Sequence, residues 1–131
     1  MKNDIPQVFI VAHGDLASVL LETVETIAGK QDNVNAFSNK EDSLPVLAEK
    51  IKQKIEESQT KNIIIFIDLV GGSCWNLANM IRKQYKDAAV IGGVNVPMLI
   101  SCFMNISEMP FTELVKKVTK DGNRGIYSLI Q

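Results

Sequence analysis

The feature that most constrains this chain is an uninterrupted apolar run, Ile63-Ile64-Ile65-Phe66-Ile67, which lies between Asn62 and Asp68. Four of its five residues are β-branched, and no polar residue alternates with them, so both faces of a strand here must be covered. Strands of this kind belong to parallel sheets that carry helices on either side. The run therefore predicts a central strand over 62–68 in an α/β fold.

Strand and helix patterns alternate along the rest of the chain. Gln7 to Ala12 is a second apolar run, which ends at the polar pair His13-Gly14 and indicates another buried strand. Further strands are expected over 34–37 and 88–94. Helices are expected over 15–28, over 97–104 and over 110–120, the last of them ended by Gly122. Another helix is expected from Asp42-Ser43 onward, with a core stripe of Leu44, Leu47, Ala48, Ile51 and Ile55. A further helix follows Gly71-Gly72-Ser73 and carries Trp75, Leu77, Ala78 and Ile81.

This order of elements predicts a doubly wound fold. Right-handed crossovers between successive strands require a mainly parallel sheet with helices on both faces, most simply in the order 2-1-3-4. A last strand over 125–130 is expected at an edge of the sheet. We expect residues 1–131 to form a single domain, because the length is within the common range for one domain.

Composition excludes several classes of function. The 14 basic and 15 acidic residues nearly cancel, so no field favours nucleic acid or an anionic membrane. The first apolar run is too short for a signal-peptide core or a membrane span, which predicts a cytoplasmic protein. Only two cysteines occur, without CxxC spacing, so neither a disulfide framework nor a zinc site is indicated.

Two polar residues lie at the ends of strands that the predicted order makes neighbours. His13 comes directly after the first strand, and Asp68 is the last residue of the third. Ligands of doubly wound sheets bind beyond the carboxyl ends of the strands at this switch point. A carboxylate that holds the proton on one ring nitrogen leaves the other nitrogen of a neutral imidazole free as a nucleophile. The sequence therefore predicts that Asp68 orients His13 for group transfer.

The segment Gly71-Gly72-Ser73 follows Asp68 and opens a helix. Its glycines permit close approach, and the Ser73 hydroxyl with the first amides of the helix can bind the oxygens of a phosphoryl group. Each residue also has an interpretation without chemistry. His13 is then a hydrogen-bonded histidine at a strand end, Asp68 a loop-capping carboxylate, and Gly71-Gly72-Ser73 a turn with a serine N-cap.

Three motifs together resemble one known family. They are Val11-Ala12-His13-Gly14, Ile67-Asp68-Leu69-Val70-Gly71-Gly72-Ser73 and Gly92-Gly93-Val94-Asn95-Val96-Pro97-Met98. In this order they resemble the mannose-family (mannose, fructose, sorbose) enzyme IIA of the bacterial phosphoenolpyruvate-dependent sugar phosphotransferase system. The resemblance extends over nearly the whole chain.

The resemblance implies roles and partners. His13 would be phosphorylated by the carrier protein HPr and would donate to a IIB domain, which serves the membrane subunits IIC and IID. Asp68 would pair with the phosphorylated ring, and Gly71, Gly72 and Ser73 would bind the phosphoryl group. The loop with Asn95, Pro97 and Met98 would border the site. No metal or organic cofactor is needed, and members of the family are homodimers in which C-terminal segments, here 125–130, exchange edge strands.

Two residues depart from the family pattern. Cys74 stands where the family commonly has proline, and Trp75 where phenylalanine is frequent. Cys74 at a helix start is either a packed thiol or a thiol of lowered pKa that is open to oxidation beside the site. Cys102 lies in an apolar stretch and is assigned no chemistry.

Other functions are compatible with some of these residues. Ser73, His13 and Asp68 also form the set of a serine hydrolase, but Trp75 stands where a nucleophile elbow has glycine. A P-loop is disfavoured because no lysine follows the glycines. A phosphohistidine carrier that serves a non-sugar or regulatory acceptor uses the same first step. The sugar itself is not encoded in a chain that never contacts it.

Overall fold

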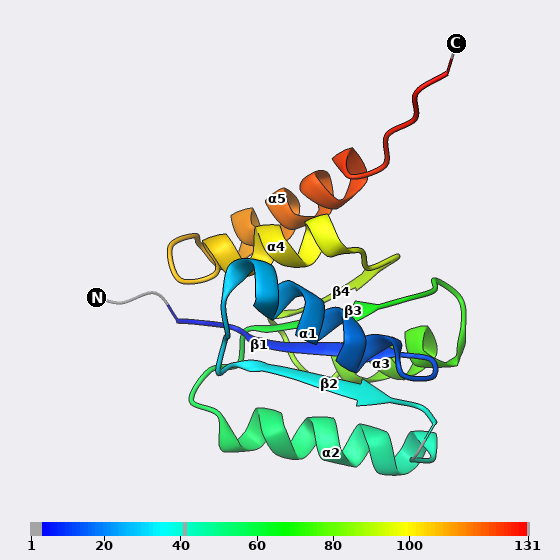
Figure 1. Cartoon of the computed structure of the whole chain (residues 1–131). Coiled ribbons are helices and arrows are strands. Elements are labelled where there is room, and N and C mark those ends of the chain that lie inside the picture. Colours follow the sequence, from blue (N-terminus) through cyan, green and yellow to red (C-terminus); the bar gives the residue numbers. More distant parts are fainter. Residues whose placement is uncertain (1–3, 41, 131) are drawn as a thin grey trace.

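The computed structural model describes residues 4–40 and 42–130, and within them it contains one parallel sheet. The strands run in the order β2-β1-β3-β4, as the sequence predicts, and every pair of neighbours is parallel (Figure 1). The elements in chain order are β1 (Gln7–Ala12), α1 (Leu16–Ala28), β2 (Val34–Ser38), α2 (Leu44–Glu57), β3 (Ile63–Ile67), α3 (Ser73–Arg82), β4 (Ala88–Gly92), α4 (Val96–Asn105) and α5 (Phe111–Arg124).

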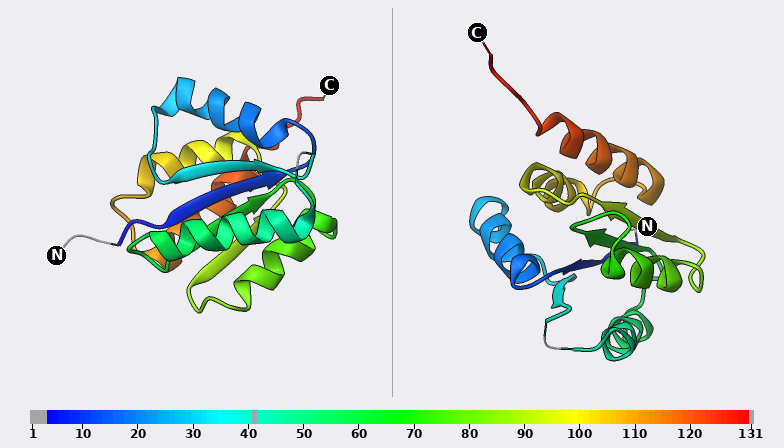
Figure 2. Two further views of the ribbon diagram at one scale, coloured as in Figure 1. Left: turned by 90° about the horizontal axis from the view of Figure 1, so that it is seen from below. Right: turned by 90° about the vertical axis from the view of Figure 1, so that its right-hand side faces the viewer.

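Helices cover both faces of this sheet (Figures 1 and 2). Helices α1 and α4 pack on one face, with α5 lying mainly on α4, while α2 and α3 pack on the other. All five residues of β3 are fully buried, which is the environment that its apolar run predicts. Alternation along the strand sends Ile64 and Phe66 toward α4 and Ile63, Ile65 and Ile67 toward α2 and α3.

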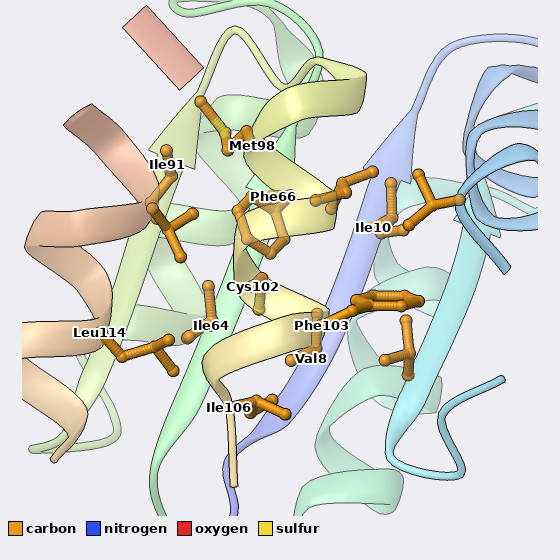
Figure 3. Packing of buried hydrophobic residues seen from close by; sticks show 14 of the residues in the cluster. Val8, Ile10, Ile64, Phe66, Ile91, Met98, Cys102, Phe103, Ile106 and Leu114 are labelled. Atoms are coloured by element: carbon orange, nitrogen blue, oxygen red, sulfur yellow. The ribbon is translucent and has the colours of Figure 1, made fainter. Parts of the chain in front are cut away.

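The two faces carry separate apolar clusters. Figure 3 shows the cluster under α4, in which Phe66, Cys102 and Phe103 pack between the sheet and the helix. Leu114 joins it from α5. This layer holds the strands in fixed register, so the residues that follow each strand emerge at defined positions along one edge.

Two helix details differ from the sequence-based expectation. Leu44 was predicted in the core stripe of α2, but it is the first helical residue and is 37% exposed. Gly122 was predicted to end the last helix, yet α5 continues through it to Arg124. Gly122 faces Met98, and a Cβ there would lie 2.5 Å from the Met98 methyl group, so glycine serves close helix packing here.

The predicted edge strand over 125–130 does not form in the single chain. Residues 126–130 have no regular structure and extend away from the sheet (Figures 1 and 2). The apolar side chains of Ile126, Tyr127, Leu129 and Ile130 are 78% to 95% exposed. Pairing of this segment with the chain's own sheet is therefore wrong, because the chain leaves the end of α5 in a direction that leads away from the sheet.

Candidate functional site

His13 and Asp68 lie side by side at the carboxyl edge of the sheet. Val11 of β1 pairs in register with Ile67 of β3, so the residues that follow the two strands emerge together. Gly14 then turns the chain with a φ of +56°, a conformation that glycine adopts without a steric penalty. The predicted juxtaposition of histidine and carboxylate is thus present in the structure.

One oxygen of Asp68 accepts two hydrogen bonds from the same residue. The backbone N–H of His13 donates to Oδ2 at 3.0 Å, and the ring atom Nδ1 lies 3.0 Å from the same oxygen. Because an ionised carboxylate only accepts, Nδ1 carries the ring proton and Nε2 keeps its lone pair. The His13 side chain is 45% exposed, whereas that of Asp68 is 13% exposed, so the ring is open to solvent and the carboxylate is largely shielded from it.

The electrostatics of the pair keep Asp68 ionised. Burial raises the pKa of this carboxyl group, but the hydrogen bonds from the backbone and ring of His13 and the charge interaction with the ring outweigh it. The net pKa of Asp68 lies below its ordinary value. An ionised Asp68 is the state that fixes the proton on Nδ1.

The N-terminus of α3 lies against the histidine ring. Gly72 is the N-cap, and a Cβ built on it would be 3.7 Å from Cε1 of His13. The first backbone hydrogen bond of the helix runs from the Asn76 N–H to the Gly72 carbonyl. The N–H groups of residues 73–75 therefore have no partner within the helix. Ser73 is the first helical residue and makes no side-chain cap, which contradicts the alternative in which it is the N-cap.

Sequence reasoning missed Ser38, which supports the histidine loop. Its hydroxyl donates to the Gly14 carbonyl at 2.6 Å, and the Asn39 amide donates to the Ala12 carbonyl at 3.3 Å. The loops after β1 and β2 are thereby tied together on either side of His13. The available signal was that Ser38 is a polar residue at the end of a strand that neighbours the first strand. It was missed because the expected strand, 34–37, stopped at Phe37.

The loop after β4 reaches the same edge of the sheet. The Val94 amide donates to the Ile67 carbonyl at 3.0 Å, next to Asp68. Asn95 caps α4 by accepting from the Met98 amide at 3.0 Å, and its amide donates to the Gly122 carbonyl at 2.9 Å. Met98 is buried, and Pro97 faces Gly125, so these side chains bind α4 to α5. Their role as a border of the site stays a prediction.

Gly92 provides a test of how the loops near the site are packed. A Cβ at this position would lie 2.3 Å from Cγ2 of Val70 and 3.1 Å from the Trp75 ring. We expect Gly92→Ala to destabilise the fold by about 1–3 kcal/mol, because the added methyl group displaces the loop after β3. Thermal and urea unfolding measure the change.

A double variant is the control for this prediction. Val70 is 60% exposed, so Val70→Ala alone should cost little. Combined with Gly92→Ala it removes the closer contact and should restore part of the lost stability. Equal destabilisation of the single and double variants would contradict the proposed contact.

Cys74 is a buried neighbour of the pair. It is fully buried, and its pKa is raised, first by burial and second by the Asp68 charge. The alternative of a thiol with lowered pKa is therefore wrong, because burial and the nearby carboxylate both oppose ionisation. Cys102 is also buried, and burial raises its pKa to about 12, in keeping with its assignment to the core.

Fold and site together define a class of protein. It is a doubly wound α/β domain with a carboxylate-oriented histidine and an open helix N-terminus at the switch point, an arrangement suited to transfer of an anionic group. Residues 7–119 match the family EIIA-man, described as the PTS system fructose IIA component. The chain belongs to this family, whose members are phosphotransferase subunits that carry a phosphoryl group in a sugar phosphotransferase system.

Individual relatives agree with the family. The mannose-specific EIIAB component of Escherichia coli K12 is 33% identical over 125 residues, which are 93% of this chain but only 39% of the relative. The chain thus spans about two fifths of that protein. The sorbose-specific EIIA component of Lacticaseibacillus casei is 31% identical over 116 residues, or 87% of this chain and 83% of the relative. A phosphotransferase component EIIA from Streptococcus agalactiae has a TM-score of 0.87 at 26% identity, covering 95% and 97% of the two chains.

Two further observations concern the helices and Ser73. None of the helices in the described ranges combines the length and apolar character that a membrane crossing needs. Among the hydrogen bonds of the described residues, none joins the Ser73 hydroxyl to His13, so the relay of a serine hydrolase is not assembled. Together with family membership, this favours the carrier over the hydrolase.

Proposed function

We propose that His13 accepts a phosphoryl group from phosphorylated HPr on Nε2 and passes it to a IIB domain, for sugar uptake through membrane subunits IIC and IID. The observation that carries this proposal is the double hydrogen bond from His13 to Oδ2 of Asp68, at 3.0 Å each. It fixes the proton on Nδ1 and leaves Nε2 bare on a ring that is 45% exposed.

The mechanism follows from this geometry. The Nε2 lone pair attacks phosphorus in line, a P–N bond forms, and the bond from phosphorus to the donor breaks with its electron pair leaving on the donor. Asp68 stabilises the positive charge that develops on the ring. The phosphoryl oxygens accept hydrogen bonds from the N–H groups of residues 73–75 and from the Ser73 hydroxyl, and the helix dipole stabilises their negative charge. Gly71 and Gly72 have no side chains that would block the approach of the phosphoryl group. Transfer to the acceptor reverses these steps.

Incubation with phosphoenolpyruvate, enzyme I and HPr tests the proposal. Intact mass should rise by one phosphoryl group, and the added group should be labile in acid, as a phosphohistidine is. Addition of a IIB protein should then discharge it. An acid-stable phosphate, or none from a competent HPr, contradicts the carrier; a phosphohistidine that no IIB protein discharges supports the regulatory or non-sugar acceptor.

We expect this chemistry to take place in the cytoplasm, as membership in the family implies, and the names of the relatives do not select one sugar. Relatives are named for mannose, sorbose and fructose, which is consistent with a carrier that does not contact the sugar. The loop after β4 reaches the same end of the strands as Asp68. The proposal therefore includes Asn95, Pro97 and Met98 as residues that border the phosphoryl site.

The C-terminal segment suggests a homodimer. Its four apolar side chains are largely exposed in the single chain, and β2 and β4 end the sheet with free edges. We expect residues 126–130 to pair with an edge strand of a second copy. Truncation after Gly125 should convert a dimer into a monomer in light scattering. A truncated chain that stays dimeric would show that the segment does not hold the copies together.

A further inference from the structure

Three side chains of types that can ligate a metal converge at the site, and the proposed function uses only two of them. The ligand atoms of His13, Asp68 and Cys74 all lie within 4.8 Å of one another. They come from the loop after β1, the end of β3 and the first turn of α3, so no local spacing in the sequence reveals them. The thiol is the additional member, at a position where the family commonly has proline.

Asp68 has unused capacity toward this cluster. Its Oδ2 atom accepts both hydrogen bonds from His13, whereas Oδ1 is buried and has no hydrogen-bond partner among residues 4–40 and 42–130. A buried carboxylate oxygen without a partner is costly and uncommon. A cation held between the carboxylate and its neighbours would satisfy it.

We propose that His13, Asp68 and Cys74 form a binding site for a thiophilic divalent cation of the Zn²⁺ type, and that the bound ion blocks phosphorylation of His13. The donor set is one imidazole nitrogen, one carboxylate oxygen and one thiolate, a mixture typical of zinc, with a water in the open position. Ligand atoms of a tetrahedral zinc ion lie about 3.5 Å apart. Adjustment by about 1 Å therefore closes the observed cluster on the ion.

The ion opposes phosphorylation through the tautomer of the ring. To bind Nδ1, the cation must take the place of the proton that Asp68 now holds there, and the neutral ring then carries its proton on Nε2. The Nε2 lone pair that attacks phosphorus is lost. The thiol proton of Cys74 passes to solvent as the metal–sulfur bond forms, with no change of oxidation state. Metal-bound and phosphoryl-accepting states of His13 thus exclude each other.

Cobalt(II) titration of the purified chain tests binding without any partner. We expect a thiolate-to-cobalt charge-transfer band and visible bands of tetrahedral type, both removed by added zinc. Cys74→Ser and His13→Ala should each weaken binding by more than about tenfold, the least that loss of even an outer partner costs a metal site. Cys102→Ala is the matched control, because Cys102 is buried in the other apolar cluster and should leave the band unchanged.

Failure of this inference is separable from failure of the carrier. The metal site is overturned if the wild type shows no charge-transfer band. It is also overturned if Cys74→Ala and Cys74→Ser still melt cooperatively and show a band as strong as that of wild type. Neither outcome depends on whether the protein is a phosphoryl carrier. The inhibitory part rests on the proposed function. Zinc should slow the phosphorylation of wild type by HPr but should not slow that of Cys74→Ser. For each protein, the rate with zinc is compared with the rate of the same protein after a chelator has removed the zinc. Equal inhibition of both proteins overturns it, because the effect then arises in the partners.

Discussion

His13→Ala should accept no phosphoryl group from phosphoenolpyruvate, enzyme I and HPr, while wild type gains one acid-labile phosphate. His13 is the only histidine in the chain, so no second imidazole can replace it. Its ring is partly exposed, and its backbone N–H still donates to Asp68 in the variant. The lost side-chain hydrogen bond to the charged carboxylate is worth about 1.5–3 kcal/mol, which is less than the total stability of a typical folded domain.

Intact mass spectrometry measures the transfer, and circular dichroism with thermal unfolding verifies the fold. Lys61→Ala is a suitable control, because Lys61 is exposed and lies just before β3, at the opposite edge of the sheet. It should be phosphorylated as fast as wild type. Acid-labile phosphate on a folded His13→Ala protein would end the carrier hypothesis.

The site was largely predictable because it depends on parallel strands. In a doubly wound sheet the carboxyl ends of neighbouring strands meet at one edge, so the runs that end at His13 and Asp68 place these residues together although they are 55 positions apart in the sequence. The order 2-1-3-4 follows from right-handed crossovers, and the structure has it. No detail of side-chain packing was needed for either step.

The errors concern features set by packing rather than by periodicity. Gly122 looks like a helix terminator, but its lack of a side chain serves contact with Met98 inside α5. Residues 125–130 have the apolar pattern of a strand, yet a strand needs an edge within reach, and α5 leads this segment away from its own sheet. Cys74 suggests a lowered pKa at a helix start, but burial and Asp68 raise it.

Some features of the site leave only a weak signal in the sequence. Ser38 is a common residue, and its hydrogen bond to Gly14 becomes visible only when the loops after β1 and β2 are placed together. The close contact of Gly92 with Val70 and Trp75 is similar, since it depends on how the loop after β3 folds back over β4. These contacts fix the loops on both sides of His13. The orientation of the ring therefore depends on several loops at the carboxyl ends of the strands.

Asp68→Asn should slow phosphorylation of His13 by about 10–100-fold, the usual range for loss of a partner that orients a reactive group. The amide lacks the charge that stabilises the ring as Nε2 attacks. It also presents a donor, and where that N–H faces the ring, Nδ1 must accept and the proton moves to Nε2, which removes the nucleophilic lone pair. Rapid-quench kinetics with excess phosphorylated HPr measure the rate of transfer.

Stability and a matched carboxylate separate orientation from a fold defect. The pKa of Asp68 is lowered in the folded chain, so its contribution to stability is present above the unfolded pKa and is lost as the pH falls through the folded one. Asp68→Asn should therefore lose stability at neutral pH and show a weaker acid dependence. Glu56→Gln, which removes the carboxylate 3.5 Å from Lys61 just before β3, at the opposite end of the strands, should leave the transfer rate unchanged. If Asp68→Asn transfers as fast as wild type, the carboxylate serves only to anchor the loop, and the ring orients itself without it.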